Sequence, residues 1–257
     1  MGHIRLGRLP KTKQWRAVFD ALECPGVDAS QLAAATAEAT ATRFDALKSD
    51  ATLHATVWLL ARLGAAAKSA NFANELESLG LDVRRAATGI GLIAEVGRVV
   101  RAQAAPTSAF AELALKAAQK VLSERVVEQS KSLFGGTLDD VRVAASSFGT
   151  KDGFASLSKD FFGEFSARAV RFIAEKELSN HVGPRESLRT LEDASALSRD
   201  IDRYCRESAE IVREFAGGWY SKANWQTERE IDRERAEGFL AYALTKMRAE
   251  IERGGRK

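Results

Sequence analysis

The four prolines constrain the fold more than any other feature, because each stands where a helix would begin or end. They are Pro10, Pro25, Pro106 and Pro184, and the 77 residues between the last two contain no proline. A proline inside a helix costs about 3 kcal/mol, so this placement favours helices between these positions. No segment shows the sustained apolar–polar alternation of a strand bounded by hairpin turns. The sequence therefore predicts an all-α protein.

Apolar residues at helical spacing divide the chain into about ten helices. We expect them over about 12–23, 28–47, 51–67, 69–79, 88–103, 108–129, from 137 onward, 158–181, 191–215 and 228–252. The phenylalanines of 158–181 indicate deep burial. Gly217-Gly218 is expected to end one helix, and Thr227 with Glu230 to open the last as a capping box.

These helices predict an irregular multi-helix bundle, with an extended basic arm over 1–11 and a single helical domain over 12–257. A division into two lobes near 134–136 stays open. Few side chains of the arm follow the core pattern, so deleting residues 2–10 is expected to leave thermal stability nearly unchanged.

Composition places the chain among ordinary globular proteins, with 45% hydrophobic and 28% charged residues. Whole-chain disorder would need fewer apolar residues and a more lopsided charge. Two cysteines cannot form a disulfide framework, which favours a cytoplasmic location. No stretch approaches the ~18 apolar residues of a membrane span, and no signal-peptide core opens the chain. We therefore expect no membrane contact.

Positive charge is concentrated at the N-terminus. Arg5, Arg8, Lys11, Lys13 and Arg16 fall within the first 16 residues, which contain no acid. The net charge is +3, so the remaining chain carries −2 and offers no basic track for a nucleic acid. A basic arm of this kind can contact phosphate, an acidic groove of a protein or the edge of a sheet. The equal alternative is a solvated terminus that binds nothing.

Recognisable catalytic motifs are missing. Gly149-Thr150-Lys151 has neither the spacing nor the preceding strand of a P-loop, and the cysteines and histidines lack metal-site spacing. Gly89-Ile90-Gly91 matches a loose dinucleotide fingerprint, but helical spacing there favours close helix packing. We expect neither cofactor nor metal, and His54 is interpreted as a half-buried structural histidine. A triad assembled from distant residues stays open.

The segment Gly217–Trp225 holds two of the four tryptophans and is expected to form a loop between the last two helices. Trp219, Tyr220 and Trp225, beside Lys222, suit stacking on a base or anchoring a protein partner. The alternative is that both tryptophans fold back and hold the helix pair together.

Three segments carry a resemblance: 2–10 (GHIRLGRLP), 177–183 (ELSNHVG) and 215–222 (FAGGWYSK). Together they resemble small uncharacterised helical proteins of bacterial antiphage defence operons. More distantly, residues 154–181 are similar to the helical QatB-like partners of QueC-like enzymes. That similarity implies Gly2 as an attachment point for a modified nucleobase.

These observations favour a non-catalytic helical adaptor of a bacterial antiphage defence complex. It would recognise a protein partner from the same operon through the N-terminal arm, with Gly2, Arg5, Arg8, Lys11 and Lys13 in contact. The alternative is a nucleic-acid-binding module that uses the arm and the Trp219–Trp225 loop. A hydrolase or nuclease with a dispersed site is the third hypothesis.

Overall fold

A computed structural model gives the fold, and it describes residues 9, 11–104, 108–127 and 137–255. These residues form helices and no strand; one isolated β-bridge joins Val182 and Leu188. The predicted all-α multi-helix bundle is confirmed. The predicted lobe division at 134–136 lies outside the described residues.

The helices follow one another with short connections. In chain order they are η1 (Lys13–Trp15), α1 (Arg16–Glu23), α2 (Ala29–Ala39), α3 (Ala41–Leu47), α4 (Ala51–Ala66), α5 (Phe72–Ser78), α6 (Gly89–Gln103), α7 (Ala109–Leu122), the π-helical turn η2 (Ser123–Val127), α8 (Leu138–Ser146), η3 (Ser147–Gly149), α9 (Lys151–Leu178), η4 (Ser179–His181), α10 (Leu191–Ser208), α11 (Glu210–Gln226) and α12 (Arg233–Gly254).

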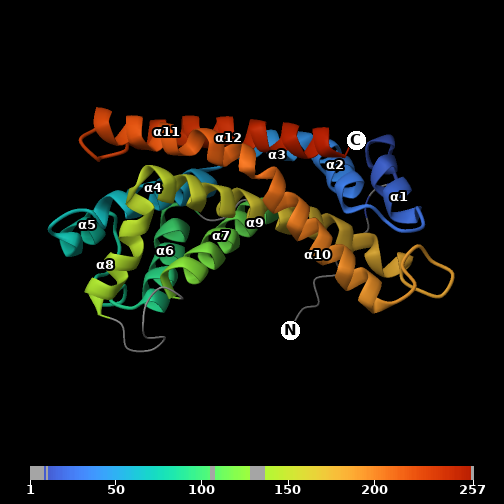
Figure 1. Cartoon of the computed structure of the whole chain (residues 1–257), viewed down its shortest axis with the longest axis horizontal. Helices are drawn as coiled ribbons and strands as arrows, with labels where there is room; N and C mark the ends of the chain where they lie inside the picture. The colour runs from blue at the N-terminus through green and yellow to red at the C-terminus, as the bar shows by residue number, and fades with distance from the viewer. Residues whose placement is uncertain (1–8, 10, 105–107, 128–136, 256–257) are drawn as a thin grey trace.

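The bundle is elongated, and α9 runs through its middle (Figure 1). Helix α9 packs against α7, α10 and α11, while α12 packs against α2, α4 and α11. Helices α11 and α12 therefore lie over α9 and α4 as one layer, which continues into α2 (Figure 1). Buried apolar side chains form one cluster that extends from Leu9 to Ile251.

Helix α9 is buried on most of its circumference, as its phenylalanines predict. Phe161, Phe162 and Phe165 are almost fully buried, and Phe165 meets Phe44 of α3 with ring centroids 5.9 Å apart. The helix begins at Lys151, well before the predicted 158, because the Thr150 hydroxyl accepts the Gly153 N–H at 3.0 Å. Such a side-chain cap satisfies a backbone donor that has no partner within the helix.

Several helix starts follow local capping chemistry. Asp28 and Asp50 cap α2 and α4, and Thr137 forms a capping box with Asp140 at the start of α8. The predicted box of Thr227 with Glu230 is wrong. Helix α12 starts later, where the Asp232 carboxylate accepts a backbone N–H.

Two predicted helices are each divided in two. The predicted 28–47 helix breaks at Thr40, whose hydroxyl donates to the Thr36 carbonyl at 2.6 Å. The predicted 191–215 helix breaks at Ala209, which is fully buried between α10 and α11. Both breaks lie within continuous helical periodicity, so apolar spacing alone does not reveal them.

Gly91 illustrates the close packing that replaces a dinucleotide site. A Cβ atom on Gly91 would lie 1.8 Å from the Arg85 carbonyl oxygen, so only glycine fits against this turn. Gly91 belongs to α6, and Thr88 caps that helix by accepting the Gly91 N–H at 3.0 Å. The prediction was close packing between two helices, whereas the contact at Gly91 is with the turn that precedes its own helix.

The N-terminal arm is tied to the core at its end. Leu9 is buried, and its N–H donates to the Glu177 carboxylate at 2.8 Å. The other Glu177 oxygen accepts from the Asn180 amide at 2.9 Å. The expectation that deleting residues 2–10 spares stability is therefore corrected, because the deletion removes a core leucine and a partner of a buried carboxylate.

Leu9→Ala tests this anchor directly. We expect the free energy of unfolding to fall by about 2 kcal/mol, at the low end for leucine-to-alanine changes because the chain end relaxes. Urea unfolding of the variant and the wild type measures it, with the exposed Lys11→Ala as control. An unchanged transition in Leu9→Ala would contradict the anchor.

A buried carboxylate links three of the central helices. Glu164 of α9 contacts Lys120 of α7 at 2.7 Å, Arg168 at 2.8 Å and Arg206 of α10 at 3.4 Å. Burial by itself would raise the pKa of Glu164. The Lys120 hydrogen bond and the charges of Lys120, Arg168 and Arg206 outweigh it and hold that pKa below its ordinary value.

Glu164 therefore contributes acid-sensitive stability. Because its folded-state pKa is lowered, the contribution is fully present above the ordinary value of 4.5 and is lost as the pH falls through the folded-state pKa. Glu164→Gln should lower stability at neutral pH and lose less stability on acidification. Urea unfolding at neutral pH and at about pH 4 measures both, and parallel losses in the two proteins would contradict it.

Candidate binding surface and basic pocket

Of the arm's two described residues, Leu9 is buried and Lys11 is exposed. Lys11 and Lys13 lie at the surface, and neither has an ion pair among the described residues. Gly2, with its predicted modification, and the arginines Arg5 and Arg8 lie outside the described residues. Their predicted role in partner binding stays a prediction.

The Trp219–Trp225 segment is helical, and its prediction as a loop is wrong. It forms the second half of α11, which continues through Gly217 and Gly218 to Gln226. Gly217 lies against the start of α9, where an added Cβ would come 2.7 Å from the Lys151 carbonyl oxygen. This glycine allows two helices to approach closely and does not terminate one.

The first two aromatic residues of this segment face inward. Tyr220 is only 3% exposed and stacks on Phe154 of α9 with ring centroids 4.4 Å apart. Trp219 is half-buried and stacks on Phe239 of α12 at 4.4 Å. Both rings therefore hold α9, α11 and α12 together, as the alternative interpretation predicted for Trp219.

The last two predicted contact residues face solvent. Trp225 is 84% exposed on the last turn of α11, and the exposed Lys222 precedes it by three residues. Residues three apart share one side of a helix. Lys222 has no ion pair within the described residues. Of the predicted pair of tryptophans, only Trp225 is available to a partner.

The described end of the arm and Trp225 do not form one surface. Helix α12 begins shortly after Trp225. It ends near α2, where Gly255 lies against Ala34. Helix α2 also packs against η1, which follows the arm. A helix of 22 residues is about 33 Å long. Figure 1 shows α11 ending at one end of the bundle and α1 lying at the other. The described end of the arm is therefore separated from Trp225 by about the length of α12.

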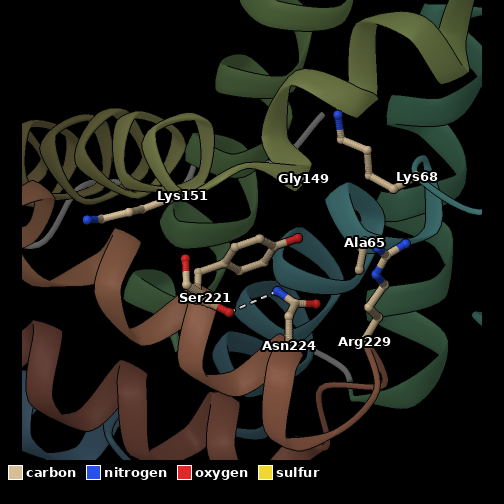
Figure 2. A pocket seen from close by; sticks show the side chains of 8 residues that line it. Ala65, Lys68, Gly149, Lys151, Ser221, Asn224 and Arg229 are labelled. Atoms are coloured by element: carbon tan, nitrogen blue, oxygen red, sulfur yellow. Dashed lines mark hydrogen bonds between the residues drawn. The ribbon is translucent and has the colours of Figure 1, made fainter.

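A cavity of about 480 Å³ opens beside α11. Its lining comes from four parts of the chain: Ala65, Lys68, Gly149, Lys151, Tyr220, Ser221, Asn224 and Arg229. Figure 2 shows Ser221 and Asn224 on α11 facing Gly149 and Ala65, with Lys68 and Arg229 on one side of the opening and the Lys151 side chain directed away from it. The lining includes three basic residues and no acidic residue.

Two residues that line this cavity carry a buried polar atom. Neither the Tyr220 hydroxyl nor the Asn224 Oδ1 atom makes a hydrogen bond of good geometry among the described residues, and the polar neighbour of the hydroxyl is the Asn224 side chain. The Asn224 amide nitrogen donates to the Tyr220 carbonyl at 2.9 Å, which fixes the amide (Figure 2). Burial raises the pKa of Tyr220 to about 12, so its hydroxyl stays protonated and able to donate.

An unusual turn carries Arg229 to the cavity. The Arg229 N–H donates to the Asn224 carbonyl at 2.8 Å, and this hydrogen bond closes the end of α11. Within the turn, Glu228 and Arg229 have φ values of 51° and 75°. Such left-handed values cost non-glycine residues free energy and concentrate at functional sites. No sequence signal marks this cavity, since its residues are distant along the chain and match no motif.

Other kinds of site are not evident in the part of the chain that the structure describes. No group of three metal-ligating side chains gathers there. Both ring nitrogens of His54 have partners, as expected of a structural histidine. Nε2 lies 2.6 Å from the Lys48 carbonyl oxygen, and Nδ1 lies 3.3 Å from the Glu237 carboxylate. None of the described helices combines the length and apolar character needed to cross a membrane.

No protein-family model, curated protein or solved structure matches this chain. The candidate surface and the cavity therefore rest on their own geometry.

Proposed function

We propose that this chain is a non-catalytic helical adaptor that binds a protein partner through the solvent-facing side of α11, with the basic N-terminal arm as a second contact. The observation that carries the proposal is Trp225, which a rigid helix holds 84% exposed. Tryptophan is enriched among the few residues that dominate binding energy at protein interfaces. Lys222 beside it favours a partner with acidic groups around an apolar pocket.

The separation of the two contacts supports an adaptor role. The described end of the arm and Trp225 lie at opposite ends of α12, so each can engage a different surface. The resemblance of segments 2–10, 177–183 and 215–222 supports a bacterial antiphage complex as the setting, with the partner encoded in the same operon.

Co-expression with each neighbouring gene product, followed by size-exclusion chromatography, tests the proposal. We expect one neighbour to co-elute with the wild type and to be lost with Trp225→Ala, at a cost of about 2 kcal/mol or more in binding free energy. Leu191→Ala is the matched control, because Leu191 is an apolar residue 78% exposed on α10. Equal losses with both variants, or no co-eluting neighbour, would contradict the proposal.

Nucleic-acid binding is the competing outcome of a second test. Fluorescence anisotropy with short single- and double-stranded oligonucleotides at two salt concentrations measures it. Phosphate contacts would weaken binding with a log–log slope of about −0.7 to −0.9 per contact. Submicromolar, salt-sensitive binding that Trp225→Ala abolishes would overturn the adaptor proposal. Weak binding at physiological salt is the expected result.

A further inference from the structure

The cavity beside α11 contains positive charge that the protein itself does not neutralise. Lys68, Lys151 and Arg229 line it, and none of them has an ion pair among the described residues. The neighbouring acids in the sequence, Asp152 and Glu228, do not contribute to the lining. Elsewhere in the bundle basic side chains are commonly paired, as Lys120 and Arg168 are with Glu164.

The start of α9 adds to this charge. Lys151 is the first residue of a helix of 28 residues, and Gly149, just before it, lines the cavity. The N-terminal end of a helix carries partial positive charge and exposes backbone N–H groups that bind anions. The backbones at Gly64 and Gly149 approach closely beside the start of α9. Only glycine allows this approach, because a Cβ on Gly64 would lie 2.8 Å from the Gly149 nitrogen.

The buried hydroxyl of Tyr220 is the independent sign of a ligand. Tyr220 is 3% exposed and belongs to the lining of the basic cavity. Its hydroxyl makes no hydrogen bond of good geometry in the described part of the protein, where its polar neighbour is the Asn224 side chain. A buried polar atom without a hydrogen bond is costly, so natural proteins retain few of them. Asn224 Oδ1, one helical turn later, makes no such hydrogen bond among the described residues either. The first atom can donate, and the second can only accept.

We propose that this cavity binds a small organic phosphate that also carries a hydroxyl group. The phosphate lies against the start of α9, where Lys68 and Arg229 neutralise its charge and the Tyr220 hydroxyl donates to one of its oxygens. The ligand's own hydroxyl donates to Asn224 Oδ1. The volume of about 480 Å³ falls in the range of small-molecule sites and exceeds what one phosphate group fills.

Isothermal titration calorimetry with ribose 5-phosphate, inorganic phosphate and ribose tests this site. We expect ribose 5-phosphate to bind more tightly than inorganic phosphate, and ribose not to bind. The double variant Lys68→Gln/Arg229→Gln should weaken ribose 5-phosphate binding at least tenfold, since charge-assisted hydrogen bonds are lost. The control Lys222→Gln removes a charge from the same region outside the lining, and it should bind as the wild type does.

Tyr220→Phe separates binding from folding. Because the hydroxyl makes no hydrogen bond of good geometry within the described residues, we expect its removal to leave the thermal unfolding midpoint unchanged or raised, and to weaken ribose 5-phosphate binding about tenfold. Unchanged affinity would overturn the proposal, and so would a lowered midpoint, which would show that the hydroxyl is bonded within the protein. Absence of phosphate-dependent binding to the wild type would overturn it too.

This site is independent of the adaptor surface. Trp225 does not line the cavity, so Trp225→Ala should retain ribose 5-phosphate binding while losing the protein partner. Loss of both activities in this one variant would overturn the assignment of the cavity as a separate site.

Discussion

Trp219→Ala is expected to lower the free energy of unfolding by about 3 kcal/mol, whereas Trp225→Ala should change it by less than about 0.5 kcal/mol. Trp219 stacks on Phe239 of α12 with ring centroids 4.4 Å apart and meets Phe154 of α9 at 5.5 Å. Its removal leaves a cavity and ends aromatic contacts among three helices. Trp225 is 84% exposed, so alanine removes little buried surface.

Urea unfolding followed by circular dichroism measures both variants against the wild type, because the remaining helices report the transition without tryptophan fluorescence. Trp219→Phe serves as a second control, since a smaller ring retains part of the stacking. Similar losses for Trp219→Ala and Trp225→Ala would show that the exposed tryptophan is packed in solution. That result would also remove the observation on which the adaptor proposal rests.

The helical class and most helix starts could be predicted because they depend on local chemistry. Prolines, apolar spacing and side-chain caps such as Asp28, Asp50 and Thr137 act within a few residues. The early start of α9 was missed although Thr150 is an ordinary cap. The phenylalanines drew the prediction toward the most apolar part of the helix.

The predicted loop at 217–225 failed because glycine has two roles that look identical in a sequence. A glycine pair after an amphipathic helix is typical of a helix end. Here Gly217 instead permits contact with Lys151, a residue 66 positions earlier. Which role applies depends on what packs against the glycine, and that information is not local.

The candidate sites show the same limit. The basic arm and the aromatic segment were each detectable as unusual compositions, yet the separation of the arm's described end from Trp225 by α12 was not. The cavity was missed because Lys68, Lys151 and Arg229 are ordinary surface residues until three helices and a turn bring them together. The buried Tyr220 hydroxyl becomes informative only when its surroundings are known.

The two glycines of α11 should respond in opposite directions to the same substitution. Gly217→Ala is expected to cost about 3 kcal/mol, at the upper end for overpacking, because the new Cβ would lie 2.7 Å from the Lys151 carbonyl oxygen. Backbone atoms cannot turn aside as a flexible side chain can, so α9 and α11 must separate. Gly218→Ala should instead stabilise the protein by about 0.5–1 kcal/mol.

That gain follows from the surroundings of Gly218, where an added Cβ meets nothing within 4 Å. The substitution therefore adds only helix propensity. Gly238→Ala on α12 is the matched control, because that position is equally open. Urea unfolding of the three variants measures the differences. If Gly217→Ala were as stable as Gly218→Ala, α11 and α9 would not be in close contact, and the wall of the cavity formed by Gly149, Lys151 and Tyr220 would be wrongly assigned.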